Sequence, residues 1–194
     1  TAIYDPYCGN PVVFIPDANF KQALLNNSGI NINNDNDIQI SEAESFTGTL
    51  DVSSLGIADL TGIEAFKNIT YLECSNNELS SLDVSANVGL VSLSCSNNKL
   101  TTIDISNNTS LVYFYANNNL LEQVNTSQNT ALLFLVAEEN ILTELNLRNN
   151  TQLEWLLVPD NQLTDLDVSA NTRLSVLNSS KNKLTSLSIA NNRI

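Results

Sequence analysis

A repeat of 21 residues dominates this sequence and restricts the chain to one kind of architecture. Six units follow one another from Ile69 to Ile194 without an insertion or a deletion. Position 11 of each unit is leucine: Leu79, Leu100, Leu121, Leu142, Leu163 and Leu184. Position 9 is always asparagine: Asn77, Asn98, Asn119, Asn140, Asn161 and Asn182. A unit this short cannot bury its own leucines, so the units must stack and share one continuous core.

The residues at the start of each unit predict a short strand. Positions 1 and 4 are large and apolar, as in Leu90 and Leu93, and position 6 is small, as in Cys95. Equivalent strands of successive units would pair about 4.8 Å apart into a parallel sheet, with position 6 facing inward. Cys74 and Cys95 are then buried free thiols, because parallel side chains suit a disulfide badly. We expect the asparagine at position 9 to hydrogen-bond the backbone of the turn after each strand.

The repeat resembles a known family. The pattern LxxLxCxxNxL at 90–100 is similar to the highly conserved segment of leucine-rich repeats. Together with LDVSxN at 82–87 and 166–171, it resembles the bacterial class of 21-residue repeats called IRREKO. Residues 50–68 resemble instead the longer, 22-residue type of repeat found in internalins. The resemblance covers 50–194 and implies a right-handed, mostly β, α/β solenoid with a concave parallel sheet and an extended rather than helical convex side.

Residues 1–49 do not repeat, and we predict that they form a small helical cap on the solenoid of residues 50–194. Asp17 is a suitable N-cap for a helix that ends near Asn26. The segment Ser41–Glu44 has the pattern of a capping box for a second, short helix. A cap of this kind would shield the first coil from water. The region also resembles the N-terminal cap of secreted bacterial repeat proteins.

The loop between the two predicted helices has the spacing of an EF-hand calcium loop. The ligands would be Asn31, Asn33, Asp35, Asp37 through its carbonyl, and Glu42. Asparagine in place of the usual first aspartate lowers the ligand charge, and Asn36 replaces the usual glycine of the tight turn. A register from Asn33 to Glu44 is an alternative. A second interpretation remains open, in which this is a polar turn that links the two helices without a metal ion.

The composition argues against an enzyme. The chain has no histidine, which excludes Ser-His-Asp and Cys-His catalysis and histidine zinc sites. The neighbouring carboxylates Glu138 and Glu139 would lie on an open surface with nothing to raise a pKa. We therefore expect a binding protein without a catalytic site.

Charge and hydropathy indicate where the protein works. The chain has 21 acidic and 8 basic residues, and a net charge of -13 repels nucleic acids and anionic membranes. No segment reaches the roughly 20 apolar residues of a membrane span. We find no signal peptide and expect that it has already been removed from a secreted or cell-surface protein. The sequence ends in phase with the repeat, so we also expect it to be part of a longer chain.

Positions 3 and 5 of each strand point to solvent in such a solenoid, and positions 7 and 8 lie at their edge. Large apolar residues gather there in units three to five: Tyr113, Tyr115, Phe134, Val136, Trp155 and Leu157. Strand propensity alone would scatter them over all units. In units four and five, Glu138-Glu139 and Pro159-Asp160 replace the Ser-Asn found at positions 7 and 8 in units one and two. We predict a binding site from the six apolar residues together with Glu138 and Asp160.

Two ligand classes fit this predicted site. Similar repeats, including internalins, act in adhesion and host contact, so the resemblance implies that the site docks a protein partner outside the cell. The alternative is a glycan, because Tyr113, Tyr115, Phe134 and Trp155 could stack on sugar rings while the polar edge binds hydroxyl groups. A third class is a passive spacer in a larger surface protein.

Overall fold

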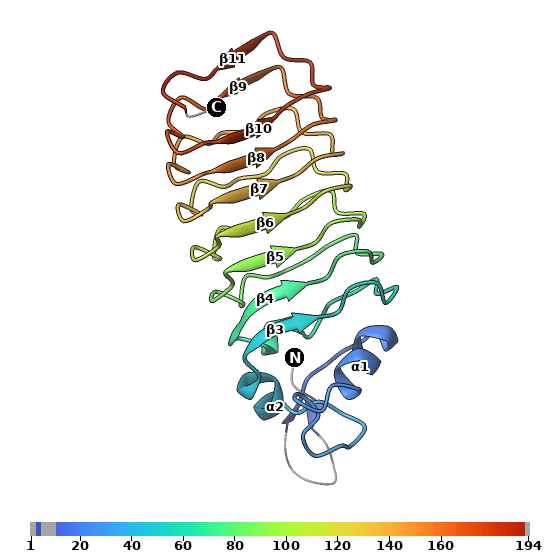
Figure 1. The fold of residues 1–194 in the computed structure, drawn as a ribbon. Helices are drawn as coiled ribbons and strands as arrows, with labels where there is room; N and C mark the ends of the chain where they lie inside the picture. Colours follow the sequence, from blue (N-terminus) through green and yellow to red (C-terminus); the bar gives the residue numbers. More distant parts are fainter. Residues whose placement is uncertain (1–2, 5–10, 193–194) are drawn as a thin grey trace.

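The structure is a computed structural model and describes residues 3–4 and 11–192. The chain winds into coils that stack in sequence order, with helices at the N-terminal end (Figure 1). Each coil up to residue 178 adds one strand to a parallel sheet of order β10-β8-β7-β6-β5-β4-β3. The strands are β3 (Gly48–Asp51), β4 (Ile69–Glu73), β5 (Ser92–Ser94), β6 (Tyr113–Tyr115), β7 (Phe134–Val136), β8 (Trp155–Leu157) and β10 (Val176–Asn178). The solenoid predicted from the repeat is confirmed.

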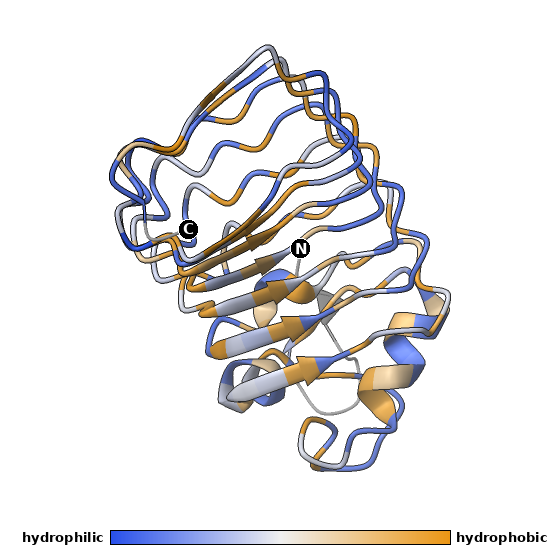
Figure 2. Cartoon of the chain, turned by 45° about the horizontal axis from the view of Figure 1, so that its top comes forward, coloured by the Kyte–Doolittle hydropathy of each residue, from blue (hydrophilic) through white to orange (hydrophobic). Residues whose placement is uncertain are grey.

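The strands pair in register at unit positions 3 to 5, because the units have equal length. Phe114 of β6 pairs with Leu135 of β7, which pairs in turn with Leu156 of β8. These central residues are fully buried, so the residues on either side of each project from the opposite surface of the sheet. We call that surface, at positions 3, 5 and 7, the sheet face; it is the predicted concave side. Figure 2 shows the strands side by side, with hydrophobic residues along them.

The returning half of each coil is extended. Near the C-terminal end, β9 (Asp165–Asp167) and β11 (Ser186–Ser188) form a second, two-stranded parallel sheet. Earlier in the solenoid, Asp83 and Asp104 form an isolated parallel bridge at the same unit position. The extended convex side that was expected is therefore present.

The interior consists of stacked rows of equivalent side chains. The leucines at position 11 are buried from Leu79 through Leu163. Position 6 is buried from Cys74 through Val158, and Cys74 and Cys95 are free thiols, as predicted. Burial raises the pKa of the Cys95 thiol to about 12. Cys8 lies outside the described residues.

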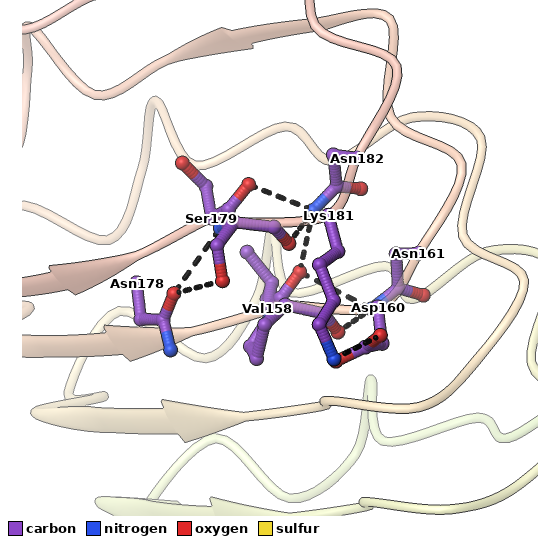
Figure 3. A network of polar contacts seen from close by, with 9 residues as sticks. Val158, Asp160, Asn161, Asn178, Ser179, Lys181 and Asn182 are labelled. Carbon is purple, nitrogen blue, oxygen red and sulfur yellow. Dashed lines mark hydrogen bonds and ion pairs between the residues drawn. The ribbon is translucent and has the colours of Figure 1, made fainter.

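The asparagines at position 9 hold the turns together, as predicted. Asn161 donates from its side-chain nitrogen to the carbonyls of Ala137, Val158 and Pro159, at 2.9, 3.3 and 3.1 Å. Its side-chain oxygen accepts the N–H of Leu142 in the preceding unit at 2.9 Å. Figure 3 shows this asparagine beside its successor Asn182, which donates to Val158 in the preceding coil and to Ser179 and Ser180 in its own. Each asparagine thus connects two coils.

A second row of asparagines, at position 19, was not predicted. These side chains are Asn87, Asn108, Asn129, Asn150, Asn171 and Asn192. Each donates from its nitrogen to two backbone carbonyls, as Asn129 does to Ile105 and Asn108, both at 2.9 Å. The side-chain oxygen has no partner in five of the six. The exception is Asn150, whose oxygen accepts the hydroxyl of Thr126 at 2.8 Å.

The cap contains a strand pair and two helices. Its elements are β1 (Ile3–Tyr4), β2 (Pro11–Val12), α1 (Ala18–Leu25) and α2 (Ile40–Ser45), and a 3-10 helix, η1 (Ile63–Ala65), follows in the first coil. The predicted N-cap Asp17 is confirmed, since its carboxylate accepts the N–H groups of Asn19 and Phe20. The capping box of α2 was predicted two residues too late, at Ser41–Glu44. It is formed by Gln39 and Glu42, because α2 begins at Ile40.

Asp17 also fastens the cap to the solenoid. Its second carboxylate oxygen accepts the N–H groups of Ala58 and Asp59, at 2.8 and 3.2 Å. Desolvation raises the pKa of this carboxyl, but the four N–H donors outweigh it and leave the pKa below its usual value. This one carboxylate therefore joins the cap to the first coil, and the ion pair between Glu44 and Lys67, at 2.8 Å, adds a second connection.

Candidate functional site

The predicted calcium loop folds around Glu42. This buried carboxylate accepts the N–H groups of Ile32 and Asn33 on one oxygen, at 2.8 and 3.2 Å. Its other oxygen accepts the N–H of Gln39 at 3.0 Å. In an EF-hand loop the same carboxylate would hold the metal ion with both oxygens. In this structure Glu42 organises the backbone of the loop.

The other predicted ligands also have partners within the loop or in α1. Asn31 donates its side-chain nitrogen to the carbonyls of Leu25 and Asp35. Asp35 accepts from Asp37 N–H and from the side chains of Asn33 and Gln39. Asp37 forms an ion pair with Lys21 at 2.6 Å. Among the described residues, no group of three or more carboxylates and cysteines is arranged to hold a metal ion. The arrangement fits the polar turn, and calcium remains a prediction for this loop.

The aromatic residues predicted to form the binding site lie side by side on the sheet face. Tyr113, Phe134 and Trp155 occupy position 3 of three neighbouring strands and pair directly in the sheet. Their ring centroids are 5.2 and 5.3 Å apart, and the ring planes are tilted by 34° and 32°. We call these three rings the aromatic row.

A second row runs beside the first at position 5, through Tyr115, Val136 and Leu157. Its central member is more enclosed than predicted: Val136 is 7% exposed and lies between Tyr115 and Leu157 on the neighbouring strands. Trp155 is the most accessible member of the two rows, at 40%. The structure thus brings together all six predicted apolar residues, and Trp155 offers the largest exposed fraction to a partner.

The acidic residues predicted at the edge of the site occupy the turns after β7 and β8. Glu139 and Asp160 have left-handed backbones, with φ of 52° and 54°, where units one to three have asparagine. Such a conformation is unfavourable for glutamate and easier for asparagine or aspartate. Asp160 forms an ion pair with Lys181, at 3.0 Å, in the next turn (Figure 3). Glu138, at position 7, is half-buried and belongs to the sheet face.

The N-terminal end of the sheet face was not predicted as part of the site. Tyr71 and Glu73 of β4 lie at positions 3 and 5, and Thr49 and Asp51 of β3 pair with them. Tyr71 is 40% exposed, as much as Trp155. Burial is the main cause that raises the pKa of the Glu73 carboxyl; Asp51 raises it further, while a hydrogen bond with Ser94 opposes both. The alternation of outward residues in 69–73 could have revealed this part of the face.

Comparisons with known proteins identify the fold. No protein-family model matches the chain, and no curated protein matches it in sequence. The functional domain of InlJ from Listeria monocytogenes has a TM-score of 0.59 and 28% identity over 88% of this chain. This chain spans about half of that one, 47%. Two further structures from the same bacterium are similar in fold: internalin C2 (TM-score 0.60, 19% identity, 92% of both chains) and the internalin inlF (0.54, 20%, 92% of this chain and 76% of that one).

The chain therefore has the solenoid fold of the Listeria internalins and is similar to these leucine-rich-repeat proteins. Within the described residues, no helix has the length and hydropathy to cross a membrane.

Proposed function

We propose that this leucine-rich-repeat protein is a secreted or cell-surface recognition module that binds a protein partner on its sheet face. The aromatic row carries the proposal. Tyr113, Phe134 and Trp155 form a continuous apolar ridge on the sheet face, opposite the side of the sheet that packs against the core. Exposed aromatic residues that cluster at the centre of a surface and have a polar edge are typical of binding hot spots.

The packing of the rings favours a protein over a glycan. Sugar rings stack on the free face of an aromatic ring, whereas Phe134 has a neighbouring ring on each side, 5.2 and 5.3 Å away. Both of its faces are therefore covered, and it presents mainly its edge. Ring edges and the exposed part of Trp155 can fill an apolar pocket of a protein. Glycan binding stays the alternative, through the accessible rings of Tyr71 and Trp155.

The experiment compares capture of a partner from surface-protein extracts of candidate target cells by the parent protein and by the double variant Phe134→Ala/Trp155→Ala. We expect the parent to retain a specific protein and the variant to lose it. The matched control is Phe14→Ala, which removes an exposed aromatic ring, 43% accessible, from the cap rather than from the sheet face. Equal capture by the parent and the double variant would show that the partner binds elsewhere.

The glycan alternative has a separate assay. Trp155 is the chain's single tryptophan, so its fluorescence reports directly on the sheet face. A change in its emission when soluble polysaccharides are added, which persists in the presence of the captured proteins, would favour a carbohydrate ligand. We expect no change across a broad polysaccharide panel.

A further inference from the structure

We propose that the partner presents a basic segment, whose lysine or arginine side chains bind at the Asp51–Glu73 end of the sheet face. This inference rests on the proposed function, because the same partner would contact the aromatic row with its apolar residues. The proposal is based on one observation: a carboxylate pair and an apolar ridge lie on the same continuous sheet.

The geometry places the two parts within reach of one short segment. Asp51 of β3 pairs directly with Glu73 of β4. The aromatic row begins two strands further on, at β6, and ends at β8. With a strand spacing of about 4.8 Å, Glu73 lies about 10 Å from the level of Tyr113 and about 19 Å from that of Trp155. An extended segment of roughly six residues spans that length at about 3.3 Å per residue.

The charges on the sheet face have one sign. No lysine or arginine occupies position 3, 5 or 7 of any of the six units, whereas Glu73 and Glu138 do lie at these positions. Among the described residues, Lys21, Lys67, Lys99 and Lys181 form ion pairs with carboxylates away from the sheet face. Asp51, Glu73 and Glu138 have no lysine or arginine partner within the described part of the chain. Their charge is therefore available to a cationic partner.

Glu73 lies beside an aromatic ring that favours a cation. On its own strand Tyr71 projects from the same face, two residues away, and an exposed tyrosine ring attracts ammonium and guanidinium groups. On its other side, beyond β5, lie the aromatic row and the row at position 5. Desolvation is the main cause that raises the pKa of the Tyr115 hydroxyl, and Tyr113 and Glu73 add to it. A lysine or arginine at Glu73 would thus meet a carboxylate and an aromatic ring together.

The charge of Glu73 acts against the stability of the isolated protein. A carboxyl whose pKa is raised by folding binds its proton more tightly in the folded state, so stability falls as the pH rises through its titration range. At neutral pH the ionised form therefore disfavours folding. A basic partner would compensate this charge, which gives the carboxylate a role in binding that it lacks in folding.

The test uses a phage library of random peptides, about twelve residues long, selected on the immobilised full chain at low salt. We expect the selected peptides to be enriched in lysine or arginine and in large apolar residues. Their affinities are then measured by fluorescence anisotropy for the parent and for the variant Asp51→Asn/Glu73→Gln. The loss of two partly exposed charge contacts should weaken binding about tenfold. Added salt should weaken binding to the parent more than binding to the variant.

The matched control is Asp83→Asn/Asp104→Asn, which changes the net charge equally on the convex side. Asparagine occupies the equivalent position at Asn125 and Asn146, so this variant keeps a residue that the repeat already accepts. We expect less than a twofold change in affinity. We also expect Asp51→Asn/Glu73→Gln to have the same melting temperature as the parent or a higher one, which excludes misfolding as the cause of weaker binding.

The outcomes separate the two proposals. The proposal of a basic partner would be wrong if the selected peptides require Phe134 and Trp155 but are not basic. It would also be wrong if they bind Asp51→Asn/Glu73→Gln as tightly as the parent. Either result would leave the proposed function unaffected. Peptides that bind Phe134→Ala/Trp155→Ala as tightly as the parent would overturn the proposed function itself. A library that yields no binder would count against both.

Discussion

The two asparagine rows make different numbers of hydrogen bonds, and the difference predicts unequal effects of the same substitution. Asn140, at position 9, accepts the N–H of Leu121 at 3.0 Å and donates to the carbonyls of Ala116, Ala137 and Glu138. Asn129, at position 19, only donates, to two carbonyls. Both side chains are buried, at 7% and 0% exposed, so their replacement by alanine removes the same atoms from similar surroundings.

The cost of each substitution follows from the groups left without a partner. In Asn140→Ala the three carbonyls keep second donors: Ala116 from Asn119, Ala137 from Asn161, and Glu138 from the N–H of Asn118. The buried N–H of Leu121 has no other acceptor. An unsatisfied buried donor costs about 2 kcal/mol, and the weakened carbonyl bonds add about 1 kcal/mol. We therefore expect Asn140→Ala to lower the free energy of unfolding by about 3 kcal/mol.

Asn129→Ala leaves no group unsatisfied. The carbonyls of Ile105 and Asn108 keep the N–H groups of Asn108 and Leu111 as donors, each at 3.0 Å. The substitution also removes a buried oxygen that has no partner. Two hydrogen bonds are lost and one desolvated acceptor is relieved, so the net cost should be about 1 kcal/mol.

Urea unfolding of the parent and the two variants measures this difference. Trp155 fluorescence and far-UV circular dichroism should give coincident transitions, which justifies a two-state analysis. The expected gap between Asn140→Ala and Asn129→Ala is about 2 kcal/mol, and the cavity contribution cancels because both lose the same atoms. If Asn129→Ala is as destabilising as Asn140→Ala, the number of buried groups left without a partner does not determine the loss of stability, and the prediction is wrong.

Four further predictions follow from single contacts. Thr126→Val should cost about 1 kcal/mol in urea unfolding, since it removes the one donor to the oxygen of Asn150; an unchanged stability would contradict the role of that bond. Glu139→Asn should raise stability by about 1 kcal/mol, because φ is 52° there; a lower melting temperature would show that the glutamate has structural contacts that asparagine lacks. Native protein at pH 8 should leave Cys74 and Cys95 unmodified by iodoacetamide, as mapped by mass spectrometry, because both are buried and their pKa is raised; rapid labelling would mean that the coils open. Because the cap loop satisfies its own hydrogen bonds, EDTA should leave the melting temperature unchanged; a fall that Ca²⁺ alone reverses would establish the calcium site predicted from the sequence.

Much of the solenoid could be predicted because the constraint repeats. An inward residue at position 4 or 6 contacts the same position in the units before and after it, so one chemical choice recurs every 21 residues. The apolar site was visible for the complementary reason. Trp155 and Phe134 break the pattern at positions where the core makes no demand, and strand propensity alone would have scattered such residues over all units.

Features that depend on contacts outside the repeat could not be predicted. Both Ser41–Glu44 and Gln39–Glu42 have the local spacing of a capping box. The helix begins at Ile40 because the carboxylate of Glu42 also binds two N–H groups ten and nine residues earlier in the loop. The partner of Asp51 was hidden in the same way, since β3 belongs to a unit whose length differs from the 21-residue period.

The separation of core and sheet face determines how the binding variants can be interpreted. The asparagine and leucine rows bond and pack coil to coil beneath the sheet, and none of these contacts passes through Phe134 or Trp155. Removal of both rings forfeits two ring–ring contacts, each worth about 1 kcal/mol, together with partly buried apolar area. The solenoid should lose some stability in the middle of the sheet but keep its fold, because the stacked rows on both sides remain. A complete loss of binding by a variant that still unfolds cooperatively can then be assigned to the sheet face itself.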